Sequence, residues 1–430
     1  MTRPRGGGDR NEAWALAQDA EDPLAWAGSQ FARPVDDAGR PLTYFCGNSL
    51  GLMPLGVKDD VVALLDDWGR LGVLGHHDAR IPWYDYHEQF RAPLGRLVGA
   101  DPHEVVAMNS LTVNLHLMLT SFYRPNGARW KVLMEESAFP SDRYAVASHL
   151  QSRGLDPDLG IIVVTPREGE AALRTEDVEA VLATRGSEIA LVLFPGVQYF
   201  TGQFFDCERI SSAAHRAGCL VGFDLAHAAG NVGLRLHDWN VDFAVWCSYK
   251  YLNAGPGAVA GCFVHQRHGR DPSLPRLAGW WGNDPATRFR MDTVPSFIPV
   301  RGADGWQVSN PPILSMAPLR ASLALFDRAG MAALREKSER LTGLVESLVH
   351  SIPGGRVSLL TPADPAARGC QLSLQIRGDA PALFGALQSR GFVGDFRAPD
   401  VIRVAPAPLY NGFHEVWRFG QVLRELVGTG

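Results

Sequence analysis

Short apolar runs alternate with longer amphipathic segments through the middle of the chain, from about residue 131 to about residue 265. Each short run is rich in β-branched residues and is bounded by polar or glycine-containing segments, a pattern that indicates buried β-strands. Because the segments between the runs have helical spacing, the pattern predicts a mostly parallel sheet covered by helices on both faces. The predicted strands are Lys131–Glu135, Ile161–Thr165, Leu191–Phe194, Leu220–Phe223, Phe243–Cys247 and Val259–His265.

Three of the intervening segments carry signals for the beginning and end of a helix. Ser, Thr and Asp side chains cap helix N-termini, and glycine commonly follows the last helical turn. The predicted helices are Ser141–Arg153, Thr175–Arg185 and Asp206–Ala217, with their first residues as N-caps and Gly154, Gly186 and Gly218 as C-terminal stops.

The C-terminal part of the chain has a different, mixed pattern. A long helical tract from about Ser315 to Ser351 leads into alternating strand and helix signals, which predicts a smaller α+β domain entered through a long connecting helix. The expected domains are an N-terminal arm over residues 1–55, a large domain over 56–315 and a small domain over 316–430. The elements expected in the small domain are Gln371–Arg377 and Val401–Val404 as strands and Ala380–Ser389 and Glu415–Val427 as helices.

Composition and charge narrow the class of partner. Of the 430 residues, 46% are hydrophobic and 20% are charged, as is usual for a globular protein with its own core. The formal net charge is −5 and no dense run of Lys and Arg occurs, so we expect no binding to nucleic acid. No apolar segment approaches the roughly 20 residues that a membrane helix needs. A small-molecule partner is therefore expected.

The first residues and the cysteines bear on location. Arg3 and Arg5 precede a short glycine run, but no apolar stretch follows, so we expect no secretory signal. The six cysteines are scattered without a Cys-x-x-Cys pair, which favours free, mostly buried thiols in a reducing compartment. The sequence therefore predicts a cytoplasmic protein.

Two polar side chains follow successive predicted strands. Asp224 comes directly after Leu220–Phe223, and Lys250 lies just beyond Phe243–Cys247 among aromatic and small residues. Because ligands of an open parallel sheet bind beyond the carboxyl ends of its strands, both side chains are expected to face one site. Taken alone, Asp224 is also explained as a turn cap and Lys250 as a surface lysine beside a turn.

Together, this lysine and carboxylate match the needs of pyridoxal phosphate. A lysine amine binds that cofactor covalently, and a carboxylate facing the pyridine nitrogen keeps it protonated, which draws electrons from the substrate. The cofactor phosphate needs backbone N–H groups, which a helix N-terminus supplies. The segment Asn109–Asn114, ahead of the apolar run Leu115–Phe122, contains hydroxyl residues suited to such a helix start.

A set of segments spread over the chain resembles the kynureninase family of fold-type-I pyridoxal phosphate enzymes. The resemblance implies a three-layer αβα large domain with a mostly parallel sheet and a smaller C-terminal α+β domain. The segments occur in the family's order and are Tyr44–Leu52, Phe139–Asp142, Tyr199–Gln203, Gly222–His227, Cys247–Gly257, Ser309–Leu314 and Ile402–Pro406.

The resemblance also implies roles for individual residues at the cofactor. Lys250 holds pyridoxal phosphate, Asp224 pairs with its ring nitrogen, and Tyr249 donates its hydroxyl to the phosphate. The family is a homodimer with shared active sites, in which the partner subunit supplies two of the cofactor contacts. The other implied cofactor-binding residues are Leu111, Thr112, Phe139, Asp142 and His227, together with Trp280 and Asn310 from the partner subunit.

The implied reaction is the hydrolytic cleavage of the Cβ–Cγ bond of L-kynurenine or 3-hydroxy-L-kynurenine to L-alanine and an anthranilate. The reaction belongs to tryptophan catabolism by the kynurenine pathway and feeds anthranilate or NAD synthesis. The catalytic residues implied are Lys250 as the base at Cα, Tyr249 as the acid at Cβ, and Asp224 at the ring.

Substrate recognition is the remaining property that the resemblance addresses. Arg403 is implied to bind the α-carboxylate, for which a planar bidentate donor is well suited. Asn310 and His76 resemble residues of relatives that handle the 3-hydroxylated ring, which predicts a preference for 3-hydroxykynurenine. Pro195 departs from members that carry a cofactor-binding serine there. The implied substrate-binding residues are Arg403, His76, Ser49 and Asn310.

Two other functions fit parts of the sequence. A cysteine desulfurase or selenocysteine lyase shares the lysine and carboxylate but needs a mobile active-site cysteine, for which only Cys370 lies near a loop. A metal-dependent hydrolase would need several histidine ligands, although adjacent histidines are poorly spaced for one helix face. The ligands considered for it are His76, His77 and Asp78 with His215 or His227.

Overall fold

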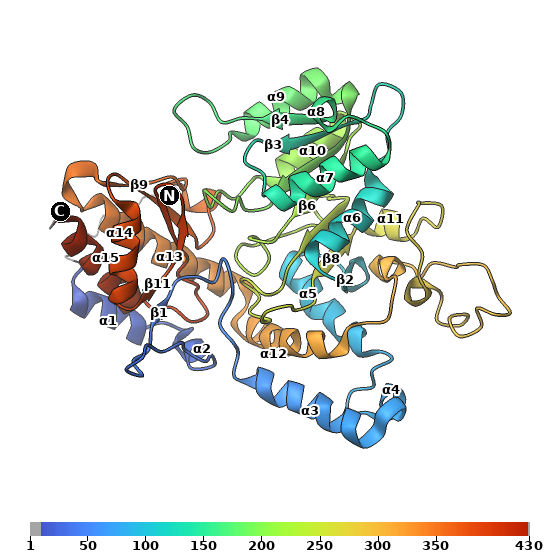
Figure 1. Ribbon diagram of the computed structural model, residues 1–430, viewed down its shortest axis with the longest axis horizontal. Coiled ribbons are helices and arrows are strands. Elements are labelled where there is room, and N and C mark those ends of the chain that lie inside the picture. Colours follow the sequence, from blue (N-terminus) through green and yellow to red (C-terminus); the bar gives the residue numbers. More distant parts are fainter. Residues whose placement is uncertain (1–9, 429–430) are drawn as a thin grey trace.

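A seven-stranded sheet forms the centre of the larger part of the molecule (Figure 1). The computed structural model describes residues 10–428, so Arg3 and Arg5 lie outside the described residues. The strand order is β2-β8-β7-β6-β5-β3-β4, and the strands from β7 to β4 are parallel to one another. The strands are β2 Val105–Ala107, β3 Lys131–Glu135, β4 Ile161–Val164, β5 Ile189–Pro195, β6 Leu220–Asp224, β7 Phe243–Trp246 and β8 Gly261–Val264.

All six strands predicted from the apolar runs are present in this sheet, with ends that differ by at most two residues. The seventh strand, β2, was not predicted. It has only three residues and pairs antiparallel with β8 at the sheet edge, and so short a run carries no readable period.

Helices cover both faces of the sheet and complete three layers. On one face, α5, α9, α10 and α12 pack into a single apolar cluster with the strands, and α6 and α7 pack into a second cluster on the other face. The three-layer αβα arrangement with a mostly parallel sheet is therefore confirmed. These helices are α5 Arg91–Val98, α6 Leu111–Phe122, α7 Pro140–Ser152, α9 Thr175–Arg185, α10 Cys207–Arg216 and α12 Ile313–Ala329.

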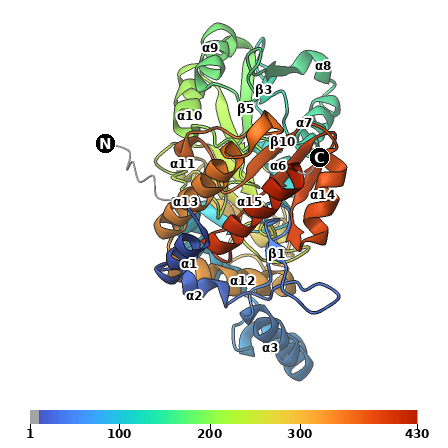
Figure 2. The same ribbon diagram turned by 90° about the vertical axis from the view of Figure 1, so that its left-hand side faces the viewer.

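A smaller region is built on a four-stranded antiparallel sheet in the order β12-β13-β10-β9 (Figure 2). Its own apolar cluster joins the sheet to the last three long helices and to α1 near the start of the chain. Its elements are α13 Met331–His350, β9 Val357–Leu359, β10 Leu372–Ile376, α14 Ala380–Ser389, β11 Phe392–Val393, β12 Asp395–Arg397, β13 Val401–Val404 and α15 Phe413–Gly428.

The N-terminal segment joins the two regions. Helix α1 packs on α15, and β1 pairs in parallel with β11, so that Thr43 faces Phe392. Helix α3 then projects from the larger region and packs against α12 (Figures 1 and 2). The elements here are α1 Glu12–Ala20, α2 Ala25–Gly28, β1 Thr43–Tyr44, α3 Gly56–Leu71 and α4 Gly75–Asp78. Within residues 10–428, no helix is long and apolar enough to span a bilayer.

Some helix ends differ from the predicted ones. The tract Ser315–Ser351 is two helices, because Gly330 between them has a φ of +75°, a left-handed conformation that ends α12. Asp206 caps α10 as predicted, but Ser141 and Thr175 lie inside the first turns of α7 and α9. Gly186 follows α9 in right-handed conformation and continues into a 3₁₀ turn.

Gly222 in β6 gives a direct test of how tightly the central strands pack. A Cβ there would lie 2.1 Å from the Phe243 ring on β7, so a side chain requires the core to shift. We expect Gly222→Ala to lower the free energy of unfolding by about 1–3 kcal/mol, measured by urea unfolding. Gly233→Ala, whose Cβ has nothing within 4 Å, is the matched control. Equal stability of the two variants would contradict this packing.

Candidate active site

A cavity lies beyond the carboxyl ends of the parallel strands, with about 490 Å³ of empty space that includes its opening to solvent. Glu135 ends β3 and Asp224 ends β6, and both line it together with Lys250, which follows β7. Strands β6 and β7 pair in parallel, with Asp224 opposite Val245. Asp224 and Lys250 therefore lie at the same end of the sheet. The predicted residues that line the cavity are Leu111, Thr112, Phe139, Asp142, Asp224, His227, Tyr249 and Lys250.

The amine of Lys250 contacts a buried histidine. Lys250 Nζ lies 3.1 Å from Nε2 of His227, and 5.8 Å from the centre of the Phe139 ring. Burial, followed by the nearby charge of Lys250, lowers the pKa of His227 well below its usual value. His227 is therefore neutral at physiological pH, and its Nε2 is placed to accept a hydrogen bond from the amine.

Two carboxyl groups meet in the cavity. Burial and the adjacent Asp224 carboxylate raise the pKa of Asp142 well above its usual value. Burial also raises the pKa of Asp224, but the backbone N–H of Ala226, which donates to Asp224 Oδ1 at 2.6 Å, acts in the opposite direction. Asp142 therefore keeps the shared proton, and Asp224 is the carboxylate of the pair.

The N-terminus of α6 forms another wall. Leu111 and Thr112 are its first two residues, and the N-cap Ser110 makes no side-chain hydrogen bond to the helix. The hydroxyl of Thr112 lies 3.1 Å from that of Ser141 at the start of α7. Two helix starts with hydroxyl side chains thus face the cavity, an arrangement suited to a phosphate group.

Unpaired polar atoms in the cavity test whether pyridoxal phosphate fits. Among the described residues, Asp142 Oδ1 and His227 Nδ1 are buried without a hydrogen-bond partner. Such atoms are costly unless a ligand satisfies them. The cavity also offers an amine, a carboxylate pair and a helix start for a phosphate, so its chemistry fits this cofactor.

Arg403 reaches the cavity wall from the small region. It lies on β13, and its Nη1 donates to the carbonyl oxygen of Tyr199, a cavity residue, at 2.5 Å. Asp395 on β12 accepts from Arg403 Nε at 2.8 Å. The side chain is almost fully buried, so Asp395 fixes its guanidinium beside the cavity.

Four predicted site residues lie away from this cavity in the single chain. Ser49 and His76 are exposed, and the ring of His76 packs on Trp83. Asn310 is exposed and bonds to Ser309, and Trp280 is half-buried against Trp281. Their roles in binding stay predictions, which for Trp280 and Asn310 require a partner subunit.

The cavity also contains residues that the sequence did not single out. Glu135 and Pro195 end strands exactly as Asp224 does, and the same argument from strand ends applies to them. Ser141 was predicted only as a helix cap. Pro195, which was noted only as a departure from family members with a cofactor-binding serine, also lines the cavity, and the lining residues missed are Glu135, Ser141, Val197, Tyr199 and Ala226.

The residues required by the two alternative functions are not assembled. Cys370 is completely buried rather than on a mobile loop. His215 bonds to Asp242 at 3.0 Å, whereas His227 lies in the cavity with Lys250. Among residues 10–428, the one group of side chains with metal-binding geometry contains none of the ligands considered.

The fold and the lysine and carboxylate at its strand ends define a pyridoxal phosphate-dependent enzyme. Residues 44–267 match the family described as Aminotransferase class-V. The solved structures with this fold include the cystine C–S lyase C-DES (TM-score 0.74, 18% identity, 89% of this chain and 97% of that chain). Another is the cysteine desulfurase CsdA from Escherichia coli (TM-score 0.74, 15% identity, 94% and 98%).

Sequence relatives narrow this class to one family. Residues 334–423 match the Kynureninase C-terminal domain. A kynureninase from Myxococcus xanthus is 54% identical over 413 residues, which cover 96% of each chain. One from Xanthomonas campestris pv. campestris is 56% identical over 402 residues, which cover 93% of this chain and 94% of the relative. The chain belongs to the kynureninase family and is a hydrolase of carbon–carbon bonds.

Glu135 generates a pH-dependent prediction. Burial raises its pKa from 4.5 to about 7, so between these values the folded protein binds a proton that the unfolded chain does not. This group therefore destabilises the fold increasingly as pH rises through that window. We expect Glu135→Gln to be more stable than wild type at pH 8 by on the order of 2 kcal/mol, but not at pH 4.5, in urea unfolding.

The exposed neighbour Glu136 provides the control, because Glu136→Gln removes the same charge without relieving burial. A Glu135→Gln effect of the same size at both pH values would show that the carboxyl is not held protonated.

Proposed function

We propose that the cavity described above performs the kynureninase reaction, the hydrolysis of the Cβ–Cγ bond of L-kynurenine or 3-hydroxy-L-kynurenine. The observation that carries the assignment is the convergence of Lys250 and Asp224 on one cavity, with Arg403 at its wall. Water supplies the oxygen, and the products are L-alanine and anthranilate or 3-hydroxyanthranilate.

Pyridoxal phosphate, when bound, withdraws electrons from the substrate carbons next to the amine. Lys250 binds the cofactor and then acts as general base at Cα, for which neutral His227, 3.1 Å away, accepts a hydrogen bond from the amine. Asp224 would pair with the ring nitrogen of the bound cofactor and keep it protonated, and Asp142 shares a proton with Asp224.

Tyr249 is the proton donor to Cβ in this proposal. Burial raises the pKa of its phenol, so the hydroxyl keeps its proton at neutral pH. It lines the cavity beside Lys250, whose Nζ lies 5.9 Å from the Tyr249 ring centre. A protonated phenol at this position is able both to bond a phosphate oxygen and to release a proton.

Arg403 binds the substrate α-carboxylate. Asp395 holds the guanidinium from one side and the Tyr199 carbonyl from another, which leaves Arg403 little freedom to turn. A fixed, planar fork of donors orients a carboxylate at low entropic cost.

The active unit is proposed to be a homodimer. Apolar side chains on and after α3 are exposed, with Trp68 at 58% and Val73 at 76% exposure. Trp68 also lines an apolar groove together with Trp83 and Leu314. A contiguous exposed apolar surface of this kind marks a protein interface. In the dimer, Trp280 and Asn310 of each subunit complete the site of the other.

Several finer assignments accompany this function. His76 and Asn310 favour 3-hydroxykynurenine, because both hydrogen-bond a phenol, and Ser49 contacts the substrate. The proposed domains of the chain are an N-terminal arm (1–55), a large domain (56–315) and a small domain (316–430). The enzyme is assigned to the cytoplasm, where free thiols persist.

Activity with both substrates tests the function. We expect wild-type protein to release alanine and a fluorescent anthranilate from each, with a higher kcat/KM for 3-hydroxykynurenine. Lys250→Ala is expected to lower kcat at least 10³-fold and to lose the visible band of the lysine-bound cofactor. Lys131→Ala, which removes a surface ion pair, is the control. An active Lys250→Ala variant would refute the assignment.

Hybrid dimers test the shared site. In dimers reassembled from equal amounts of Lys250→Ala and Asn310→Ala subunits, half are hybrids with one intact site, so about a quarter of wild-type activity is expected. Lys250→Ala mixed with Asp224→Ala leaves no intact site and is the matched control. If the first mixture is as inactive as the control, Asn310 does not act across the interface.

A further inference from the structure

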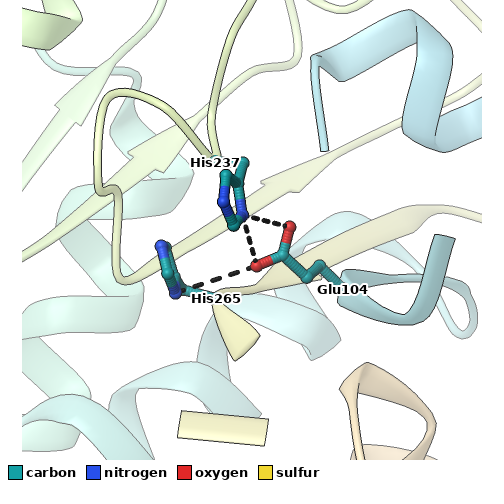
Figure 3. A group of neighbouring side chains, drawn as sticks. All are labelled: Glu104, His237 and His265. Atoms are coloured by element: carbon teal, nitrogen blue, oxygen red, sulfur yellow. Dashed lines mark hydrogen bonds and ion pairs between the residues drawn. The ribbon is translucent and has the colours of Figure 1, made fainter. Parts of the chain in front are cut away.

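Three side chains meet at one end of the strands of the large sheet, and the active site lies at the other end (Figure 3). Glu104 directly precedes β2, His265 directly follows β8, and His237 lies in the connection between β6 and β7. Because β8 runs antiparallel to β7, the end of β8 lies beside the start of β7. The cavity lies beyond the other end of β7, so this group is a separate site.

The polar atoms of the three side chains converge. Nδ1 of His237 lies 3.0 Å from both carboxylate oxygens of Glu104, and Nδ1 of His265 lies 3.7 Å from Oε1. One ligand atom from each residue falls within 4.8 Å of the others. Figure 3 shows both imidazole rings turned toward the carboxylate.

Glu104 is an unusual carboxylate because it is fully buried at a sheet edge. Within residues 10–428, its ion-pair partners are the two histidines, and no Lys or Arg is paired with it. The backbone N–H groups of Asp101 and Gln266 donate to it at 3.0 and 2.7 Å. A buried carboxylate without a fixed cation is costly, which favours a cationic partner.

Arg267, which follows His265 by two residues, does not serve as that partner. The guanidinium of Arg267 bonds to Asp242 at 2.6 Å and to the side chain and carbonyl oxygen of Asn240. Its backbone N–H makes a long contact of 3.3 Å with Nδ1 of His265, which leaves that nitrogen weakly engaged. The positive charge of Arg267 is thus neutralised by Asp242, outside the group.

We propose that Glu104, His237 and His265 form a binding site for a divalent transition metal ion, with Zn²⁺ as the best match. Two imidazole nitrogens and one carboxylate oxygen are a donor set of zinc proteins, whereas Mg²⁺ and Ca²⁺ prefer oxygen ligands alone. The His237 side chain is one-third exposed, which gives the ion a path of entry, and a water molecule would be the fourth ligand.

The bound ion ties together three separate segments. His237 belongs to the connection that leads from Asp224 and His227 to Tyr249 and Lys250, and its backbone N–H donates to Gly99 after α5 at 3.0 Å. Metal binding therefore stabilises the edge of the sheet and the path of this connection. The ion touches no residue of the cavity and takes no part in the reaction.

The test uses the full-length enzyme with its cofactor, freed of metal by a chelator and then titrated with Co²⁺ and Zn²⁺. We expect one Co²⁺ per chain with visible d–d absorption, displaced by Zn²⁺, and a rise of several degrees in Tm with Zn²⁺. His237→Gln is expected to weaken binding at least tenfold and to abolish the Tm shift. Because His237 is at the surface, this variant is expected to fold.

His103→Gln is the matched control, since it removes an exposed histidine next to Glu104 that is not in the group. It is expected to bind Co²⁺ as wild type does. The proposal is overturned if wild type binds no stoichiometric Co²⁺, if His237→Gln binds it equally well, or if the cobalt spectrum shows the charge-transfer band of a cysteine ligand. The test measures metal binding and Tm instead of kynureninase activity. A failure of the proposed function would therefore not change its result.

Discussion

Parallel pairing of β6 with β7 is the constraint on which the active site depends. The backbone N–H of Leu225 donates to the carbonyl of Val245 at 2.7 Å, which fixes where each strand ends. A shift of one residue in this register would turn the side chains to the opposite face of the sheet. The separation of Asp224 from Lys250 is therefore set by backbone hydrogen bonds rather than by any contact between the two side chains.

Burial shapes the electrostatics of the cavity as much as the identity of its side chains does. Three acidic groups, Glu135, Asp142 and Asp224, share a space with one amine and one neutral histidine. Burial raises the pKa of Glu135, and burial together with the Asp224 charge raises the pKa of Asp142, so these two carboxyls hold their protons more tightly than usual. Asp224 is left as the carboxylate best supported by N–H donation.

Most of the larger region was predictable from sequence because its strands are continuous apolar runs. The bounds of α9 in this region and of α14 in the smaller region are the predicted ones. The break at Gly330 was missed, since apolar spacing continues across it and only the left-handed φ ends the helix. For the site, strand ends indicated Asp224 and Lys250 alone, and the further residues came from family resemblance. The positions of Ser141 and Tyr199 in the cavity wall required the tertiary structure, because packing decides which residues of a helix start or a loop face a cavity. Trp280 and Asn310 do not line the cavity of their own chain, so no argument from strand ends within one subunit indicates them.

The pairing of β1 with β11 also orders the events of folding. Thr43 leaves the ribosome long before its partner Phe392. The last strand of the large sheet ends at residue 264, whereas β1 stays unpaired until its partner β11 has also been synthesised. Closing so long a loop makes this region the slower one to assemble. The strand β13, which carries Arg403 with its proposed role at the substrate carboxylate, therefore forms after the strands that position Asp224 and Lys250.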